Sequence, residues 1–459
     1  MGQNSQQNEI IKRLQVEDAD ERRLTVEELI SSELTDDIVK VLVQMIKDPD
    51  KGVRDSLSFT LSYNGHPSIP KYLTPFISSE DIAIRNLAGD ILLKIGPPAV
   101  DALLDYLPKG SDDDKKFIID LLGLIGDSRA SQPIYEILKT TENDNVKLAC
   151  IEAWGNIKSK EYINILYEMY KENELFKPTI IETFGKIGEP STLDFMIEIF
   201  ENEDDITKFS IIESLGIIGN EKTFFFLLNE LLKNKGPINW PIISSLRQIK
   251  ERYNLEIPYD ESLKKIFLST FEEADLKYKK DAAYLLRMFG DIDTLTAFIK
   301  YIGLDYEIDE TIKDKLIENA EIIYPKLVEL IGEQPSNLLS LLNLCKELND
   351  NTQKSAYEKL TDLEKQNFCN NLSNCLKNTD EEIRRVSMEL LFELNEEFAL
   401  LFVDIMLNDE NMWNRYKLAE ILEKMPFEKT KNILTLMLKD SEEMISQKAK
   451  EILDSNEKK

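Results

Sequence analysis

Apolar residues along this chain come in short blocks with helical spacing, and the ends of these blocks repeat. Five successive blocks end at equivalent positions, which are Gly96, Gly126, Lys158, Gly188 and Gly219. The steps between these positions are 30, 32, 30 and 31 residues. A constant period of this length is typical of architectures in which one supersecondary unit is stacked many times.

A second marker has the same period. Before each block, a basic residue follows an acid or amide by four positions, in the pairs Asp50/Arg54, Asp81/Arg85, Asp112/Lys116, Asn143/Lys147, Asn173/Lys177 and Asp204/Lys208. We expect the first residue of each pair to cap a helix N-terminus. We interpret the pairs themselves as structural: each is worth about 0.3–0.5 kcal/mol on a surface and could also bridge neighbouring repeats.

Each period contains two predicted helices. In one of them, residues 132–139 form a short first helix, residues 140–144 a loop, and residues 146–157 a second helix. The second helix has apolar residues at the i, i+3, i+4, i+7 spacing of a buried face, and glycine at such an end supplies a left-handed C-cap. One pair cannot bury its apolar face alone, but stacked pairs can. The pattern therefore predicts an all-α, right-handed α-solenoid of stacked antiparallel helix pairs.

The Leu-Gly-x-Ile-Gly block ends and the Asp-x-x-x-Arg/Lys starts resemble the HEAT-like repeats of the short type that also occur in phycobilisome bilin lyases. The resemblance is clear over residues 36–220 and remains recognisable in the next pair, at 221–233 and 239–253. It implies that the second helices line a concave surface.

The regularity of the pattern divides the chain into five segments. Residues 9–253 form a regular repeat array, and residues 378–454 form C-terminal repeats that begin with the marker Asp380/Arg384. Pairing is irregular over 254–377, where a hinge, a change in curvature or a domain boundary near Ile257 is expected. Residues 1–8 are predicted to be a disordered polar tail, and residues 455–459 a polar C-terminal tail.

The balance of charge limits the classes of partner. There are 85 acidic and 56 basic residues, a formal net charge of −29. This balance disfavours nucleic acid and anionic membranes and favours a basic protein partner. The four cysteines form no Cys-x-x-Cys pair, so we expect buried free thiols in a reducing compartment. Without a signal peptide or a spanning apolar run, we predict a cytoplasmic protein, and we expect it to be a monomer.

Few residues suggest catalysis. His66 is the single histidine, so a His-based catalytic pair is improbable and a His-rich metal site is excluded. No phosphate-binding or dinucleotide-binding glycine motif occurs. We predict no enzyme activity, catalytic residue, metal or cofactor. The alternative is a bilin-lyase-like chromophore attachment factor or a related enzyme-accessory factor, which is suggested only by the shared repeat type.

One acidic position recurs with the repeats. An acid lies six residues before each block end, and Glu389 has the matching place five residues after Arg384, which yields Asp90, Asp120, Glu152, Glu182, Glu213 and Glu389. At about 100° per residue, this position points away from the apolar face. The resemblance then implies a column of carboxylates along the concave groove. Two explanations stay open: the column binds a partner, or repeat duplication preserved its register. The leading hypothesis is a scaffold or adaptor that holds a protein or basic peptide segment.

The three tryptophans are interpreted mainly as packing residues. Trp154 lies in an apolar register, whereas Trp240 and Trp413 open helices. The last two could alternatively be exposed anchors for a partner.

Overall fold

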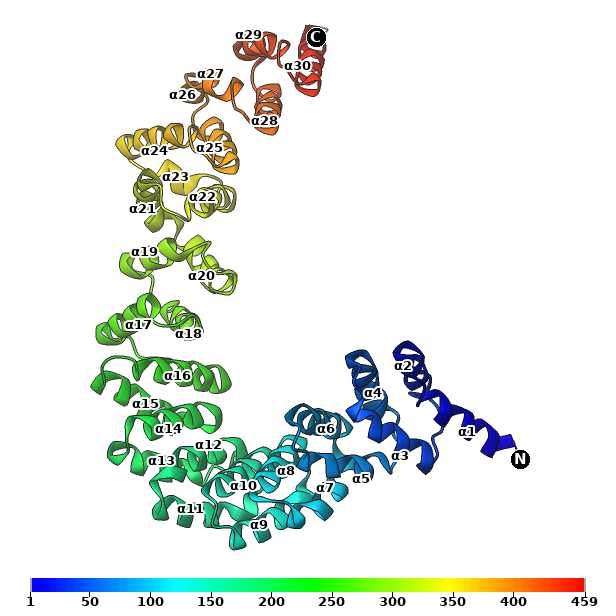
Figure 1. The fold of residues 1–459 in the computed structure, drawn as a ribbon. Coiled ribbons are helices and arrows are strands. Elements are labelled where there is room, and N and C mark those ends of the chain that lie inside the picture. Colours follow the sequence, from blue (N-terminus) through cyan, green and yellow to red (C-terminus); the bar gives the residue numbers. More distant parts are fainter. Residues whose placement is uncertain (1, 458–459) are drawn as a thin grey trace. The chain divides into compact units, whose positions relative to one another are not determined.

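The computed structural model describes residues 2–457, and over this range the chain consists of helices, turns and loops with no β-strand. The helices form antiparallel pairs that stack in chain order (Figure 1). This confirms the predicted all-α solenoid. The chain divides into two compact units, residues 1–256 and 257–459.

In unit 1, the helices form two rows. The first helices of the pairs are α1 (Gly2–Arg13), α3 (Asp36–Gln44), α5 (Ile69–Leu73), α7 (Val100–Tyr106), α9 (Ser131–Thr140), α11 (Ile163–Glu172), α13 (Thr192–Ile199) and α15 (Glu221–Lys233). The second helices are α2 (Ala19–Glu28), α4 (Lys51–Tyr63), α6 (Ile82–Ile95), α8 (Asp112–Ile125), α10 (Asp144–Ile157), α12 (Lys177–Ile187), α14 (Asp205–Ile218) and α16 (Asn239–Tyr253). We call the second helices of unit 1 the inner row, because they lie on the inner side of its curve (Figure 1).

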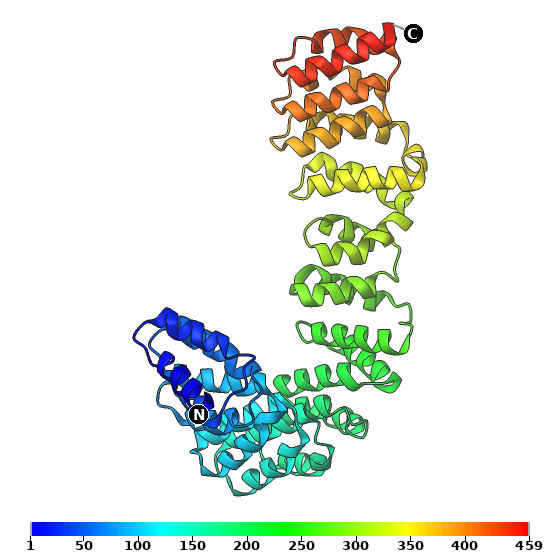
Figure 2. The ribbon, with the colours of Figure 1, turned by 90° about the vertical axis from the view of Figure 1, so that its right-hand side faces the viewer.

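Unit 2 has the same plan, but one of its first helices is divided into two short pieces. The first helices are α17 (Glu261–Glu273), α19 (Ile292–Tyr301), α21 (Ala320–Glu333), α24 (Asp362–Cys375), the two short pieces α26 (Glu396–Leu400) and α27 (Val403–Leu407), and α29 (Phe427–Met437). The second helices are α18 (Leu276–Leu286), α20 (Tyr306–Glu318), α22 (Leu338–Thr352), α25 (Glu381–Leu394), α28 (Met412–Glu423) and α30 (Glu443–Glu457). Figure 2 shows the helices of this unit as successive layers. The short helix α23 (Ser355–Glu358) interrupts the alternation before α24.

Both predicted tails differ from the structure. Residues 2–8 belong to α1, which is held by the buried Leu14 just beyond its end and by a 2.8 Å hydrogen bond from Gln7 Nε2 to Thr35 Oγ1. At the other end, α30 includes residues 455–457. The physical reason is that extending an existing helix costs far less than nucleating one, so polar residues follow an anchored turn. Residues 1 and 458–459 lie outside the described range.

The predicted caps are largely confirmed. Side chains of Asp50, Asp81, Asn143 and Asp204 accept backbone N–H groups at the starts of α4, α6, α10 and α14. At α8, however, the cap is Ser111, which forms a capping box with Asp114, and Asp112 lies in the first turn. Glycine at the second-helix end is left-handed at Gly126 and Gly188, both with φ of 74°, as predicted.

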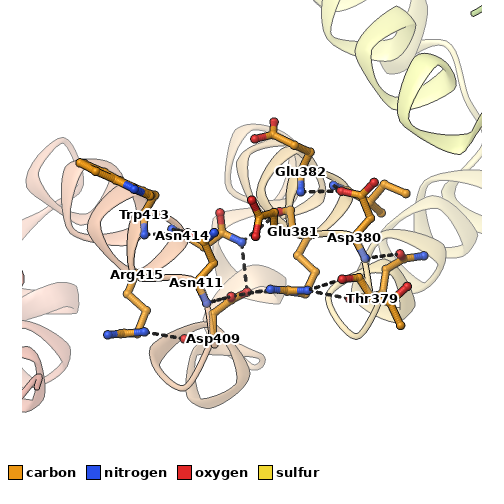
Figure 3. A network of polar contacts seen from close by, with 12 residues as sticks. Thr379, Asp380, Glu381, Glu382, Asp409, Asn411, Trp413, Asn414 and Arg415 are labelled. Carbon is orange, nitrogen blue, oxygen red and sulfur yellow. Dashed lines mark hydrogen bonds and ion pairs between the residues drawn. The ribbon is translucent and has the colours of Figure 1, made fainter. Parts of the chain in front are cut away.

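The marker bases pair in two ways. Lys116 and Lys147 bind Asp120 and Asp144 on their own helices, whereas bases of other repeats bind an acid of the next repeat, as the sequence interpretation allowed. Arg22 binds Asp48, Arg384 binds Asp409 and Arg415 binds Asp440, at 2.8, 2.8 and 2.7 Å and over 25 or 26 residues. In these three cases the capping side chain accepts first-turn N–H groups, and the arginine binds the acid of the next repeat. Figure 3 shows this network around Asp409.

Candidate functional site

The inner row of unit 1 has a ladder of hydrogen bonds that sets its helices in register. Thr183 Oγ1 donates to the Ile151 carbonyl at 3.1 Å, and Ser214 Oγ donates to the Ile181 carbonyl at 3.0 Å. Ser245 Oγ makes the equivalent bond to Ile212 at 2.8 Å. Thr183 and Ser214 each follow a predicted acidic site residue, Glu182 or Glu213, by one residue. The accepting carbonyls of Ile151, Ile181 and Ile212 each belong to the residue just before such an acid, on the preceding inner helix. Equivalent positions on α10, α12, α14 and α16 therefore lie side by side.

Five of the predicted site residues occupy this register on five successive inner helices. We call Asp90, Asp120, Glu152, Glu182 and Glu213 the acidic column; they lie on α6, α8, α10, α12 and α14. Asp90, Glu152 and Glu182 are exposed, and Asp120 and Glu213 are half-buried. None of them points into the hydrophobic core, which matches the orientation expected from the helical period.

The charges of the acidic column act on one another. Burial raises the pKa of Asp120, Lys116 opposes this rise, and the charge of Glu152 adds to it. Burial likewise raises the pKa of Glu182, against Lys186, and the charges of Glu152 and Glu213 add to it. Consecutive carboxylates are thus close enough to disfavour one another's ionised forms.

Two lysines partly neutralise the acidic column. Lys116 Nζ lies 2.7 Å from Asp120, and Lys186 Nζ lies 3.7 Å from Glu152. Both pairs are at least one-third exposed, so each stabilises the fold only slightly and can be exchanged for an external cation.

The register identifies two further positions that the sequence pattern missed. Thr60 Oγ1 donates to the Val26 carbonyl at 3.0 Å, so a bond of the same kind joins α2 and α4. The corresponding column positions are Glu27, a sixth acid, and Phe59, an aromatic residue. The block on α2 has no glycine end, but Asp18/Arg22 repeats the acid–base marker and Glu27 follows Arg22 by five residues, so this signal could have found it.

Glu389 belongs to unit 2 and has a different environment from the acidic column. It is hydrogen-bonded to Lys346 and lies 3.6 Å from Lys417, and its side chain is only 18% exposed. Two lysines therefore compensate its charge within the fold. Glu389 is therefore not part of the acidic column that the other five predicted residues form.

Glu389 lines a hollow of about 630 Å³ on the second helices α22, α25 and α28. Trp413 forms part of its wall, is 57% exposed, and meets the ring of Tyr416 at 6.3 Å between centroids. The packing interpretation was therefore wrong for Trp413, and its exposure agrees with the alternative of an exposed anchor. Trp154 is fully buried, as predicted, and stacks on Tyr162 at 4.3 Å.

The described residues provide little for covalent or metal chemistry. All four cysteines are buried and free, and burial raises the pKa of the Cys150 thiol to about 12, so it is a poor nucleophile at neutral pH. Within this part of the chain, no group of three or more His, Cys, Asp or Glu residues could hold a metal ion. No helix in the same range has the length and apolar character needed to cross a bilayer.

Comparison with known proteins points to one repeat type. Residues 100–177 match a family model described as HEAT repeats. No curated protein matches the sequence.

Several solved structures are similar in fold. A structure of Kap95p with RanGDP is 13% identical with a TM-score of 0.49, over 98% of this chain and 66% of that one. Kap121p bound to Nup53p is 13% identical with a TM-score of 0.39, over 98% and 60%, and importin beta is 12% identical with a TM-score of 0.45, over 95% and 73%. This chain thus spans less than two thirds of the first two, and likeness at this level carries no argument about function. Residues 100–177 are thus similar to HEAT repeats, and helix pairs of the same plan are stacked on both sides of this segment.

Proposed function

We propose that this chain is a non-catalytic scaffold whose inner row in unit 1 binds a basic segment of another protein. The observation that carries the proposal is the acidic column: five carboxylates at one register on successive helices, none of them buried. Packed helices lie about 8–10 Å apart, which is close to three residues of extended chain. A segment with a lysine or arginine at about every third position therefore matches the spacing of the acidic column.

Mutual repulsion within the acidic column supports a cationic ligand. Asp120 and Glu182 have raised pKa values, first through burial and further through neighbouring carboxylates. A bound cation lowers this cost. The net charge of −29 acts in the same direction at longer range, because it attracts a basic partner before contact.

The remaining parts of the proposal concern location and chemistry. We propose a cytoplasmic location, which four buried free thiols support because such thiols suit a reducing compartment. The alternative of bilin attachment rests on the repeat type alone.

The test is charge reversal in the acidic column. The variant Glu152→Lys/Glu182→Lys/Glu213→Lys should bind a fluorescein-labelled nonapeptide with lysine at every third position at least about tenfold more weakly, because three charge contacts of about 0.5–1 kcal/mol each are lost. Fluorescence anisotropy measures the dissociation constant, and the wild-type affinity should fall as salt is added.

The matched control reverses the same number of charges on first helices. Glu136, Glu168 and Glu198 are exposed residues of α9, α11 and α13. Their triple lysine variant has the same net charge as the column variant and should bind the peptide nearly as wild type does. An equal loss of peptide affinity in both variants would show that net charge alone explains the binding. Unchanged affinity in the column variant would contradict the proposal.

A further inference from the structure

One position of the inner row carries an aromatic pair where its neighbours carry acids. Phe59 has the column position on α4, and Tyr63 follows it by one turn. Their side chains are 58% and 61% exposed, and their ring centroids are 4.8 Å apart. Aromatic side chains of this size normally gain stability by burial, so two adjacent exposed rings indicate a surface that a partner covers.

Carboxylates occupy the equivalent position on both neighbouring helices and one turn before Phe59 on α4. Glu27 and Asp90 have the column position on α2 and α6, the helices on either side of α4 (Figure 1). Asp55 precedes Phe59 by one turn on α4, and all three acids are exposed. Of the nearby bases, Arg23 already pairs with Asp20 and Glu27, at 3.4 and 3.9 Å, and Lys94 lies one turn beyond Asp90. The surroundings of the rings are therefore negative overall.

A small, mainly apolar pocket adjoins the ring of Tyr63. It has a volume of about 190 Å³, and its walls include Leu61, Tyr63, His66, Ile69, Ile95 and Pro98. This volume is below the range of about 300–1,000 Å³ that is usual for sites of whole small molecules. It is of a size for one aliphatic side chain.

We infer that Phe59, Tyr63 and the pocket beside them form an anchor for a partner segment in which a lysine or arginine adjoins a leucine, isoleucine or methionine. The cation lies over the exposed rings and is compensated by Glu27, Asp55 and Asp90, and the aliphatic side chain enters the pocket. A second copy of this chain is a poor occupant, because it would bring a net charge of −29 against these carboxylates. The inference rests on the proposed function, since it assigns an end point to the segment that the acidic column binds.

The test uses the full chain and fluorescein-labelled octapeptides of glycine and serine with a central Arg-Leu, Glu-Leu or Arg-Ala pair. Arg-Leu should bind tightest, and Phe59→Ala or Tyr63→Ala should weaken it about tenfold. Both rings are more than half exposed, so these variants should keep the wild-type circular dichroism and melting temperature. Phe225→Ala is the matched control, because Phe225 is 44% exposed on the first helix α15 and should leave binding unchanged.

The outcomes separate the two proposals. Weaker binding of Arg-Leu to Phe59→Ala, with normal binding to the Glu152, Glu182 and Glu213 triple variant, supports the anchor. The acidic column is then tested separately, by the affinity of the triple variant for the lysine nonapeptide. Equal binding of Glu-Leu and Arg-Leu, or unchanged affinity in Phe59→Ala, overturns the anchor. The proposed function survives that result if the triple variant still loses the lysine nonapeptide.

Discussion

Single glycines allow the inner helices to approach one another closely. Gly155, Gly185 and Gly216 each follow a column acid by three residues and face a small residue of the next inner helix. A Cβ atom built at Gly216 would lie 2.9 Å from Ser245 Cβ and 3.1 Å from Ser245 Cα. Because the backbone of α16 occupies that space, the contact tolerates no side chain.

We therefore expect Gly216→Ala to destabilise the protein. Alanine favours a helix over glycine by about 1 kcal/mol, but overpacking against a backbone atom costs about 1–3 kcal/mol, so the net change should be a loss of up to about 2 kcal/mol. Urea unfolding at neutral pH measures it. Gly52→Ala is the control, because a Cβ there would meet only side-chain atoms of Asp50 and Arg23. A variant as stable as wild type would show that α14 and α16 can separate at little cost.

Between neighbouring elements, the arginine bridges connect the start of one second helix to the loop of the next repeat. Arg384 donates to both oxygens of Asp409 at 2.8 Å and to the carbonyl of Asn378 at 2.9 Å. Its side chain is 13% exposed and that of Asp409 is 9% exposed. Such bidentate, nearly buried pairs define the geometry between repeats far better than exposed pairs do.

Removing one partner of this bridge should be costly. Arg384→Met leaves the Asp409 carboxylate buried with only Asn411 N and Asn414 Nδ2 as donors, so we expect a loss of about 3 kcal/mol in the free energy of unfolding of unit 2. Lys40→Met, which breaks the exposed 3.1 Å pair with Asp37, should change stability by less than about 0.5 kcal/mol.

The same bridges predict how stability depends on acid. Arg415 holds the pKa of Asp440 below its usual value against the opposing effect of burial. At Asp409 burial raises the pKa, and hydrogen bonds from Arg384, the Asn411 backbone and Asn414 outweigh it, so that the pKa is lowered. These two carboxyls stabilise the fold fully at pH values above their unfolded-state pKa of about 4. This stabilisation is lost as pH falls through their folded-state pKa. Between pH 5 and 3, Arg384→Met should therefore lose less stability than wild type, as urea unfolding can measure.

For the molecule as a whole, the excess of acids is the dominant electrostatic fact. With 85 acidic and 56 basic residues, repulsion among exposed carboxylates opposes the folded state. Adding salt from about 0.01 to 0.3 M shortens the Debye length from about 30 Å to below 8 Å. We expect the melting temperature to rise over this range, because the buried bridges are screened much less than the exposed acids. A falling melting temperature would mean that exposed ion pairs outweigh the net repulsion.

The repeat pattern was sufficient to predict much of the architecture. Periodic apolar blocks require stacked helix pairs, since one pair alone cannot cover its apolar face. The five acids from Asp90 to Glu213 could be placed away from the core because their angle to that face follows from the helical period. Residues 2–8 were misjudged, because burial of Leu14 by later helices is not visible in a local polar sequence.

The sequence by itself thus determined the fold class, the caps and the one-per-repeat acids, all of which depend on local spacing along the chain. Only the tertiary structure decided which residues meet across repeats. It paired Arg384 with Asp409, left Trp413 exposed, placed Glu389 between two lysines, and joined α2 to α4 through the hydrogen bond from Thr60 to the Val26 carbonyl. The physical reason is that contacts over 25 or more residues depend on how helices stack, and the spacing within one helix carries no information about the side chain that the next helix presents.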